Sequence, residues 1–223
     1  MAGLIEVICV DMAGTTMADD GLVVGAFRRT IAALGLDRAR AARAEAYATS
    51  TMGQSKLEVF RAIFGADAPR ANAVFESAIA DVARDVGVSE LPGTRDVVTR
   101  WRASGRRVAL TTGFSPETRE TLVELLGWRG LFDLRVSPAD VGRGRPAPDM
   151  VWWSAVRLEA SSSEALLVVG DTAADIESGR RAGAGRCVGV RTGSDDDERL
   201  RAAGAHDVVD SIADLELDPS RDR

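Results

Sequence analysis

Short apolar runs alternate with helical patterns along most of the chain. Runs rich in β-branched residues predict strands at 4–10, 108–112, 166–170 and 187–190, with weaker ones at 132–136 and 207–209. Helical patterns lie between them, at 94–104, 116–126, 147–159, 173–182 and 196–204. Strands that alternate with helices of this length predict right-handed β-α-β crossovers. We therefore expect an α/β fold whose Rossmann-like core is a doubly wound, mostly parallel sheet.

The alternation breaks after the first predicted strand. Residues 20–88 contain no good strand, but helical stretches at about 22–35, 38–50, 54–64 and 69–85, separated by glycines and a proline. All-helical sequence between the first two strands indicates a small inserted helical cap. We expect a core made of 1–18 and 90–223 and a cap made of 19–89.

Composition narrows the function classes. The 223 residues suffice for one core domain with a small insertion, and 28 basic against 34 acidic side chains give a net charge of −6. Such an acidic chain is a poor partner for nucleic acid.

No apolar run reaches the roughly 18 residues of a membrane helix, and the N-terminus lacks the basic region of a signal peptide. We expect a cytoplasmic protein with no membrane partner and no disulfide framework, because Cys9 and Cys187 lie in apolar runs. The tail 218–223 is predicted to be disordered.

Lysine usage is unusual. Of the 28 basic side chains only Lys56 is a lysine. A coding bias toward arginine explains this without any function. Arginine, however, cannot replace lysine where a neutral amine must act as a nucleophile, because guanidinium stays charged. Lys56 is therefore a candidate nucleophile.

Residues with candidate chemistry follow the predicted strands. Asp11 ends the first strand in DMAGTT, where Thr15 offers a hydroxyl, and the second strand ends in Thr111, Thr112 and Gly113. Ligands of parallel sheets bind at the carboxyl ends of strands. Hydroxyls and free backbone N–H groups in tight turns bind phosphate. These residues predict an anion site at one edge of the sheet.

Charged residues follow the later strands at the same edge. Arg145 lies in GRGRPAPD, just before a predicted helix, and Asp171 and Asp175 stand four apart after the fourth strand. Two such carboxylates can face one Mg²⁺. Each residue also has a structural explanation: the aspartates can cap a helix, and the arginine can be a solvated loop charge. The occurrence of all of them in order, each after a strand, favours a functional site.

The stretches DMAGTT, LTTG, GRPAPD and VGDTAADIESGRRAG, in this order and with a cap after the first, resemble the haloacid dehalogenase-like hydrolase superfamily. The resemblance implies that Asp11 is the nucleophile that forms an aspartyl-phosphate. It implies that Thr111 and Arg145 bind the phosphoryl group, and that Asp11, Asp171 and the Ala13 carbonyl hold Mg²⁺ with Asp175 behind them. Relatives form cap-to-cap dimers, so a homodimer stays open.

One position departs from the common phosphatases of this superfamily. They have a second aspartate two residues after the nucleophile, which protonates the leaving alkoxide, and here that residue is Ala13. DMAGTT and the cap segment TMGQSK resemble the phosphonoacetaldehyde hydrolases, or phosphonatases, which have alanine at this site and a cap lysine after a Met-Gly pair. Met52 and Gly53 form that pair and are candidate substrate-binding residues. A lysine imine turns the carbanion expelled from a C–P bond into an enamine, so no such acid is needed.

The resemblance leaves rival functions open. In phosphonatases a histidine follows the lysine by three residues and a cysteine lies in the first linker, whereas this chain has Val59 and Gly21. We expect a Mg²⁺-dependent hydrolase that cleaves the P–C bond of a small phosphonate through Asp11 and Lys56. The second hypothesis is a small-molecule phosphatase with the same machinery, and the third is a catalytically silent binding protein.

Overall fold

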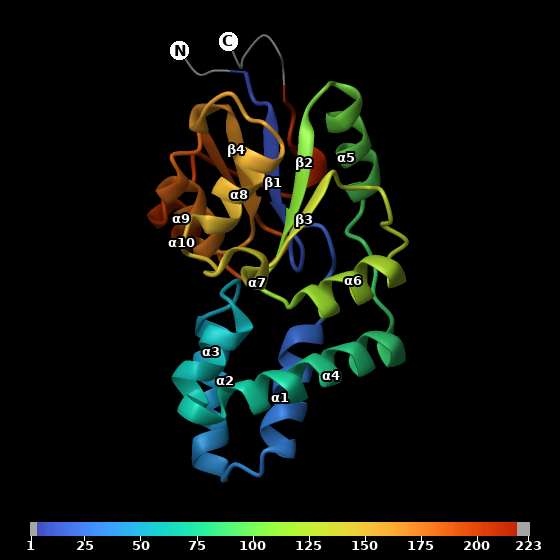
Figure 1. The fold of residues 1–223 in the computed structure, drawn as a ribbon. Coiled ribbons are helices and arrows are strands. Elements are labelled where there is room, and N and C mark those ends of the chain that lie inside the picture. The colour runs from blue at the N-terminus through green and yellow to red at the C-terminus, as the bar shows by residue number, and fades with distance from the viewer. Residues whose placement is uncertain (1–3, 218–223) are drawn as a thin grey trace.

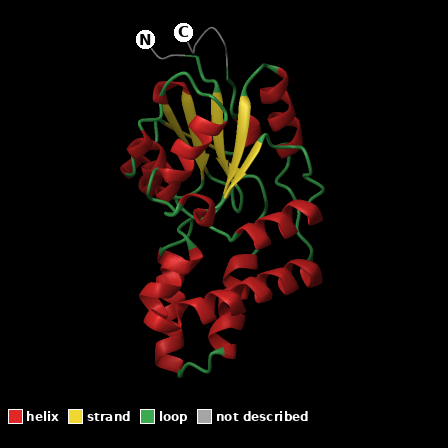
Figure 2. Cartoon of the chain, viewed as in Figure 1, coloured by secondary structure: helices red, strands yellow, loops and turns green. Residues whose placement is uncertain are grey.

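A six-stranded parallel sheet forms the centre of the molecule (Figures 1 and 2). The structure is a computed structural model that describes residues 4–217. The strand order is β3-β2-β1-β4-β5-β6, so β1 lies between β2 and β4. The strands are β1 (Val7–Asp11), β2 (Arg107–Thr111), β3 (Leu134–Val136), β4 (Leu166–Gly170), β5 (Arg186–Val190) and β6 (Asp207–Val209). The chain reverses its winding direction beside β1, which is where sheets of this kind bind ligands.

Helices cover both faces of the sheet. The helices outside the insertion are α5 (Thr94–Ala103), α6 (Pro116–Leu125), α7 (Pro138–Val141), α8 (Asp149–Arg157), α9 (Ala173–Ala182) and α10 (Asp197–Ala202), with 3-10 turns η2 (Ser163–Ala165) and η3 (Ile212–Asp214). Side chains of β1 alternate between the faces: Val7 and Cys9 pack in one hydrophobic cluster and Ile8 and Val10 in the other. Because every residue of β1 is buried, its sequence is apolar throughout until Asp11.

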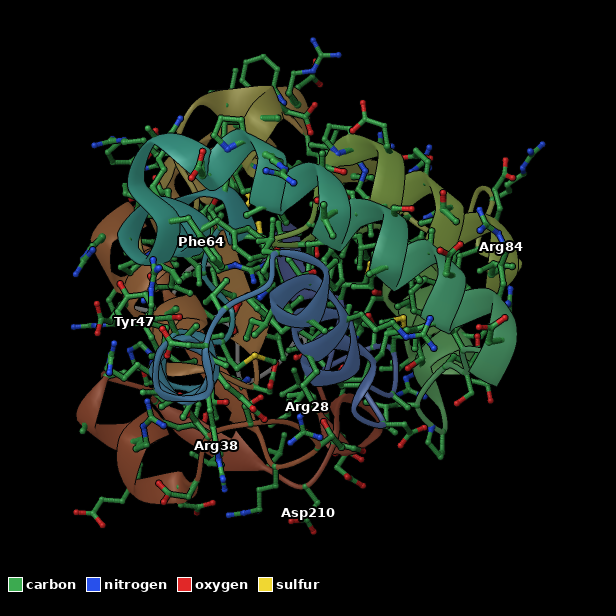
Figure 3. The ribbon with its side chains drawn as sticks, turned by 90° about the horizontal axis from the view of Figure 1, so that it is seen from below. Arg28, Arg38, Tyr47, Phe64, Arg84 and Asp210 are labelled. Atoms are coloured by element: carbon green, nitrogen blue, oxygen red, sulfur yellow. The ribbon has the colours of Figure 1, made fainter. Side chains whose placement is uncertain are left out.

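The insertion after β1 is entirely helical. It contains α1 (Leu22–Ala33), α2 (Arg38–Ser50), α3 (Lys56–Phe64), the 3-10 turn η1 (Gly65–Asp67) and α4 (Ala68–Val86). Figure 3 views the molecule from below, with these helices in front of the sheet. Phe27, Phe60 and Phe75 form their aromatic centre, with ring centroids 4.9 to 5.5 Å apart. We call residues 19–89 the cap.

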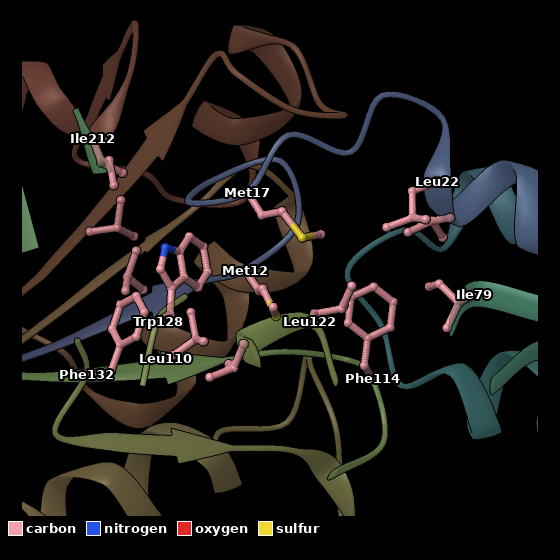
Figure 4. Packing of buried hydrophobic residues seen from close by; sticks show 14 of the residues in the cluster. Met12, Met17, Leu22, Ile79, Leu110, Phe114, Leu122, Trp128, Phe132 and Ile212 are labelled. Atoms are coloured by element: carbon pink, nitrogen blue, oxygen red, sulfur yellow. The ribbon is translucent and has the colours of Figure 1, made fainter. Parts of the chain in front are cut away.

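The two connections between cap and core run side by side. Met17 and Glu90 form an antiparallel bridge, and the Leu91 amide donates to the Thr16 carbonyl at 2.9 Å. Farther along, Phe114 lies between Leu122 of α6 and Ile79 of α4 (Figure 4). One hydrophobic cluster therefore continues from the sheet into the cap.

The predicted α/β fold is confirmed. All six predicted strands and the nine predicted helices form, and the sheet is parallel throughout. The domain limits at 18/19 and 89/90 stay a prediction, which the pairing of Met17 with Glu90 supports. The tail 218–223 lies outside the described residues. Within residues 4–217, no helix is long and apolar enough to span a membrane.

Candidate active site

A buried guanidinium joins the carboxyl ends of β1 and β2 to the start of α9. Arg145 Nη1 lies 2.6 Å from Asp11 Oδ1 and 2.8 Å from Asp175 Oδ1, and its Nη2 donates to Thr111 Oγ1 at 2.6 Å. The Arg145 side chain is only 3% exposed. The solvated-loop alternative for Arg145 is therefore wrong, because this cation is buried against two carboxylates.

Asp171 faces the same place from the end of β4. Its Oδ1 accepts from Thr15 Oγ1 at 3.1 Å, and its Oδ2 accepts from the Ser194 amide at 2.8 Å. Backbone approaches this carboxylate closely, since a Cβ on Gly14 would lie 2.6 Å from Asp171 Oδ2. Gly14 also has a φ of +90°, which favours glycine. The DMAGTT turn is thus built to hold backbone against Asp171.

Asp175 caps α9, as the structural explanation predicted, and also contacts Arg145, while its role behind Mg²⁺ stays a prediction. It is the third residue of α9, where its carboxylate accepts from the Thr172 amide at 3.1 Å and completes a capping box. Its other oxygen binds Arg145. The capping-box hydrogen bonds at the start of α9 orient Asp175 so that its other oxygen is directed at Arg145.

Negative charge exceeds positive charge around Arg145. Burial raises the pKa of Asp11, with the nearby Asp175 carboxylate adding to the effect and Arg145 opposing it. Burial also raises the pKa of Asp171, and the carboxylates of Asp11 and Asp175 raise it further. Three buried carboxylates face one guanidinium and the amine of Lys56, so the site is short of positive charge.

Mg²⁺ fits this donor set. Carboxylate and carbonyl oxygens are the hard ligands that it prefers, and a divalent cation would offset the surplus of negative charge. Among residues 4–217, no three acidic, histidine or cysteine side chains already form a ligating cluster. Arg145 binds Oδ1 of Asp11, so a metal ion held by Asp11 would lie close to this guanidinium.

Lys56 enters the site from the cap. It is the first residue of α3 and is buried, and its amide donates to the Gly113 carbonyl at 3.3 Å. Burial lowers the pKa of its amine to about 8, with Arg145 adding to the fall and the carboxylates of Asp19 and Asp11 opposing it. A neutral amine is therefore accessible near physiological pH, as a nucleophile requires.

A small cavity brings the two candidate nucleophiles together. Asp11 and Lys56 both line a space of about 20 Å³, which holds about one water molecule. The other candidate residues from the sequence that line this cavity are Ala13, Met52, Gly53, Thr112, Gly113, Arg145 and Asp171. Thr15, Thr111 and Asp175 lie behind this layer and hold Asp171 or Arg145. The closed site must open to admit a phosphoryl group.

Several residues of the site had no prediction from the sequence. Val23, Phe114, Thr172 and Ser194 line the cavity, and Asp19 acts on the Lys56 charge. The loop with Ser194 follows β5, so the strand-end rule that selected Asp171 could have found it. No local signal marks Asp19 as a neighbour of Lys56.

The haloacid dehalogenase-like hydrolase family model matches residues 5–183. The chain belongs to this hydrolase family. As a haloacid dehalogenase-like hydrolase it is an enzyme, and the resemblance drawn from its motifs is confirmed. It is 32% identical to the phosphonoacetaldehyde hydrolase of Nitratidesulfovibrio vulgaris, over 95% of this chain and 89% of the relative.

Solved structures agree with this membership. A phosphonoacetaldehyde hydrolase-like protein from Oleispira antarctica superposes with a TM-score of 0.84 and 28% identity, over 99% of this chain and 93% of that one. CbbY from Rhodobacter sphaeroides, solved with phosphate, superposes with a TM-score of 0.78 over 95% of this chain and 96% of that one. At 22% identity CbbY shows only that the hydrolase shares its fold.

Proposed function

We propose that this hydrolase cleaves the P–C bond of a small phosphonate with a carbonyl group next to the phosphonate-bearing carbon, as in phosphonoacetaldehyde. The observation that carries the proposal is that Lys56 and Asp11 line one cavity. An amine and a carboxylate at one place can attack the two ends of such a substrate. The names of the relatives from Nitratidesulfovibrio vulgaris and Oleispira antarctica support this substrate class.

The first step is imine formation. The neutral amine of Lys56 adds to the carbonyl carbon and water leaves, and a proton taken up from solvent gives the protonated imine. Because the pKa of the Lys56 amine is about 8, a usable fraction of the amine is neutral at pH 7. The Lys56–Gly113 hydrogen bond holds the lysine backbone above the loop that follows β2.

The second step breaks the P–C bond. Asp11 attacks phosphorus and becomes an aspartyl-phosphate, while the electron pair of the P–C bond moves into the imine to give an enamine. The enamine takes a proton on carbon and is hydrolysed, which frees Lys56 and releases the aldehyde. A second water hydrolyses the aspartyl-phosphate to phosphate and Asp11. The net reaction consumes one water.

Ala13 is consistent with this route. An aspartate here would serve to protonate an alkoxide leaving group, a contribution of roughly 10²–10⁴-fold to the rate. The imine removes the need for it, because the electrons of the broken bond have a stable destination. Ala13 lines the cavity beside Asp11 and carries no group that can donate a proton.

Asp11, Asp171 and the Ala13 carbonyl would hold Mg²⁺, with Asp175 supporting them. The ion would neutralise negative charge on the phosphoryl oxygens and on Asp11. Arg145, already directed at Asp11, would bind the phosphoryl group from the other side. The cytoplasmic location and a homodimer stay predictions.

The second candidate is a phosphatase. It would use Asp11 as nucleophile, and Lys56 would serve only as a positive charge that orients the substrate. Val59 favours it, because the site of the expected phosphonatase histidine is filled by a side chain that is 2% exposed and packs in the hydrophobic cluster. Gly21 likewise offers no thiol.

Product analysis separates the two candidates. With phosphonoacetaldehyde, wild type should release equal amounts of acetaldehyde and phosphate. Lys56→Arg keeps the charge but cannot form an imine, so it should release neither. Phosphate-ester hydrolysis that survives Lys56→Arg, with no phosphonate cleaved by wild type, would establish the phosphatase instead.

A further inference from the structure

A second, larger pocket adjoins the small cavity between cap and core. Its volume is about 180 Å³, room for several heavy atoms. Lys56, Gly113 and Phe114 line both spaces. Lys56 therefore lines both the cavity that Asp11 lines and the larger pocket.

A carbonyl substrate bound to Lys56 as an imine has two substituents on the carbon that is attached to the amine. The carbon attached to the amine must place its phosphonate arm toward Asp11. Because Lys56 also lines the larger pocket, the other substituent on that carbon can extend into this pocket. In phosphonoacetaldehyde that substituent is a single hydrogen atom, which would leave the pocket unused. The geometry thus favours a substrate that continues beyond the carbonyl carbon.

The pocket contains an acceptor for that continuation. Glu76, on α4 of the cap, lines it, and Glu76 Oε2 accepts from Ser115 Oγ at 2.6 Å and from Thr118 Oγ1. These contacts with the start of α6 fix the carboxylate across the cap–core junction. Glu76 Oε1 is buried and has no hydrogen-bond partner. A buried acceptor without a partner is costly, and a ligand group that donates a hydrogen bond would relieve this cost.

Neighbouring groups extend the polar lining. Asn72 lies one helical turn before Glu76 on the same face of α4 and also lines the pocket. Glu58 and Arg61 line it as exposed residues, so the pocket leads outward from Lys56 toward solvent.

We propose that the pocket between α3, α4 and α6 is a subsite for the far end of the substrate, where Glu76 selects a chain carrying a hydroxyl or amino donor beyond the carbonyl carbon. This rests on the proposed function. Glu76 is a specificity-determining residue, whereas Lys56 and Asp11 perform the chemistry.

A matched pair of ketones tests the subsite. The probes are 2-oxopropylphosphonate and 3-hydroxy-2-oxopropylphosphonate, which differ only by one hydroxyl beyond the carbonyl. Wild type should prefer the hydroxylated ketone by at least about tenfold in kcat/KM, the effect of one hydrogen bond to a charged acceptor. Glu76→Ala should reduce the preference to about twofold or less. Glu124→Ala removes an exposed carboxylate on α6 and should preserve it.

The outcomes distinguish this proposal from the proposed function. Cleavage of phosphonoacetaldehyde with equal kcat/KM for the two ketones would overturn the subsite and leave the P–C activity in place. If wild type cleaves no phosphonate, the proposed function fails. Calorimetric dissociation constants for the two ketones then decide the subsite, and equal affinities refute it. These measurements on wild type test the subsite even if Glu76→Ala does not fold.

Discussion

The amide of Lys56 donates a hydrogen bond to the carbonyl oxygen of Gly113 at 3.3 Å. The only lysine of the chain is thereby tied, through its backbone, to the loop after β2. The approach is close, since a Cβ on Gly113 would lie 2.5 Å from the Gln54 carbonyl oxygen. The placement of Lys56 thus depends on contact between cap and core.

Asp11→Asn should lower turnover to below about one per cent of wild type, because an amide is a poor nucleophile toward phosphorus. The fold should persist, since the change removes one of three buried carboxylates that repel one another. Steady-state rates and a thermal melt measure both effects. Turnover above a few per cent would contradict the assignment of Asp11 as nucleophile.

Removal of divalent ions with a chelator should abolish activity, and added Mg²⁺ should restore it. Asp171→Asn should raise the Mg²⁺ concentration that gives half-maximal rate by at least about tenfold, because one charged oxygen ligand is lost. Glu198→Gln, an exposed acid in the first turn of α10, is the matched control and should leave that concentration unchanged. Full activity after exhaustive chelation would refute the metal site.

The sheet edge could be predicted from the sequence because its signals are local. Apolar runs of strand length end at Asp11, Thr111 and Gly170, and parallel strands bring their carboxyl ends together. The acidic run 195–198 by itself predicts a helix N-terminal cluster. Asp196 does cap α10, but Asp195 is buried and accepts from the Ala173 amide at 2.7 Å, at the start of α9. That contact joins distant segments, so the local pattern could not show it.

The cap–core contacts could not be predicted for the same reason. Glu76 binds Ser115 across 39 positions, and Asp19 acts on Lys56 through space. The pattern of apolar residues along α4 does not indicate which of its faces packs against α6. The short helix α7 also escaped prediction, since four residues are too few for a helical pattern.

Gly53→Ala should impair catalysis by disturbing cap closure. A Cβ here would lie 2.3 Å from Thr172 Oγ1, and the φ of +79° is unfavourable for alanine. Gly35→Ala carries a similar backbone cost, with a φ of +66° and no atom near its Cβ. We expect kcat/KM to fall at least about tenfold for Gly53→Ala and less than about twofold for Gly35→Ala. Equal effects of the two variants would show that closure at Gly53 is unimportant.

The rate of imine formation should rise with pH through about 8. Lys56 has a pKa lowered from 10.5 to about 8, so its reactive neutral form is scarce below that value and dominant above it. Asp19 favours the charged amine, so Asp19→Asn should move the midpoint to lower pH. Asp20→Asn removes an exposed neighbouring charge and should change it less. A midpoint near 10.5 in wild type would contradict the buried amine.

Borohydride reduction of a substrate imine tests the central claim most directly. Wild type, phosphonoacetaldehyde and borohydride should give an inactive enzyme, with the added mass on the peptide that contains Lys56. Lys56 is the only lysine, so Lys56→Arg should remain unlabelled at this peptide. An unmodified Lys56 peptide from wild type that is actively turning over phosphonoacetaldehyde would show that the bond is broken without an imine.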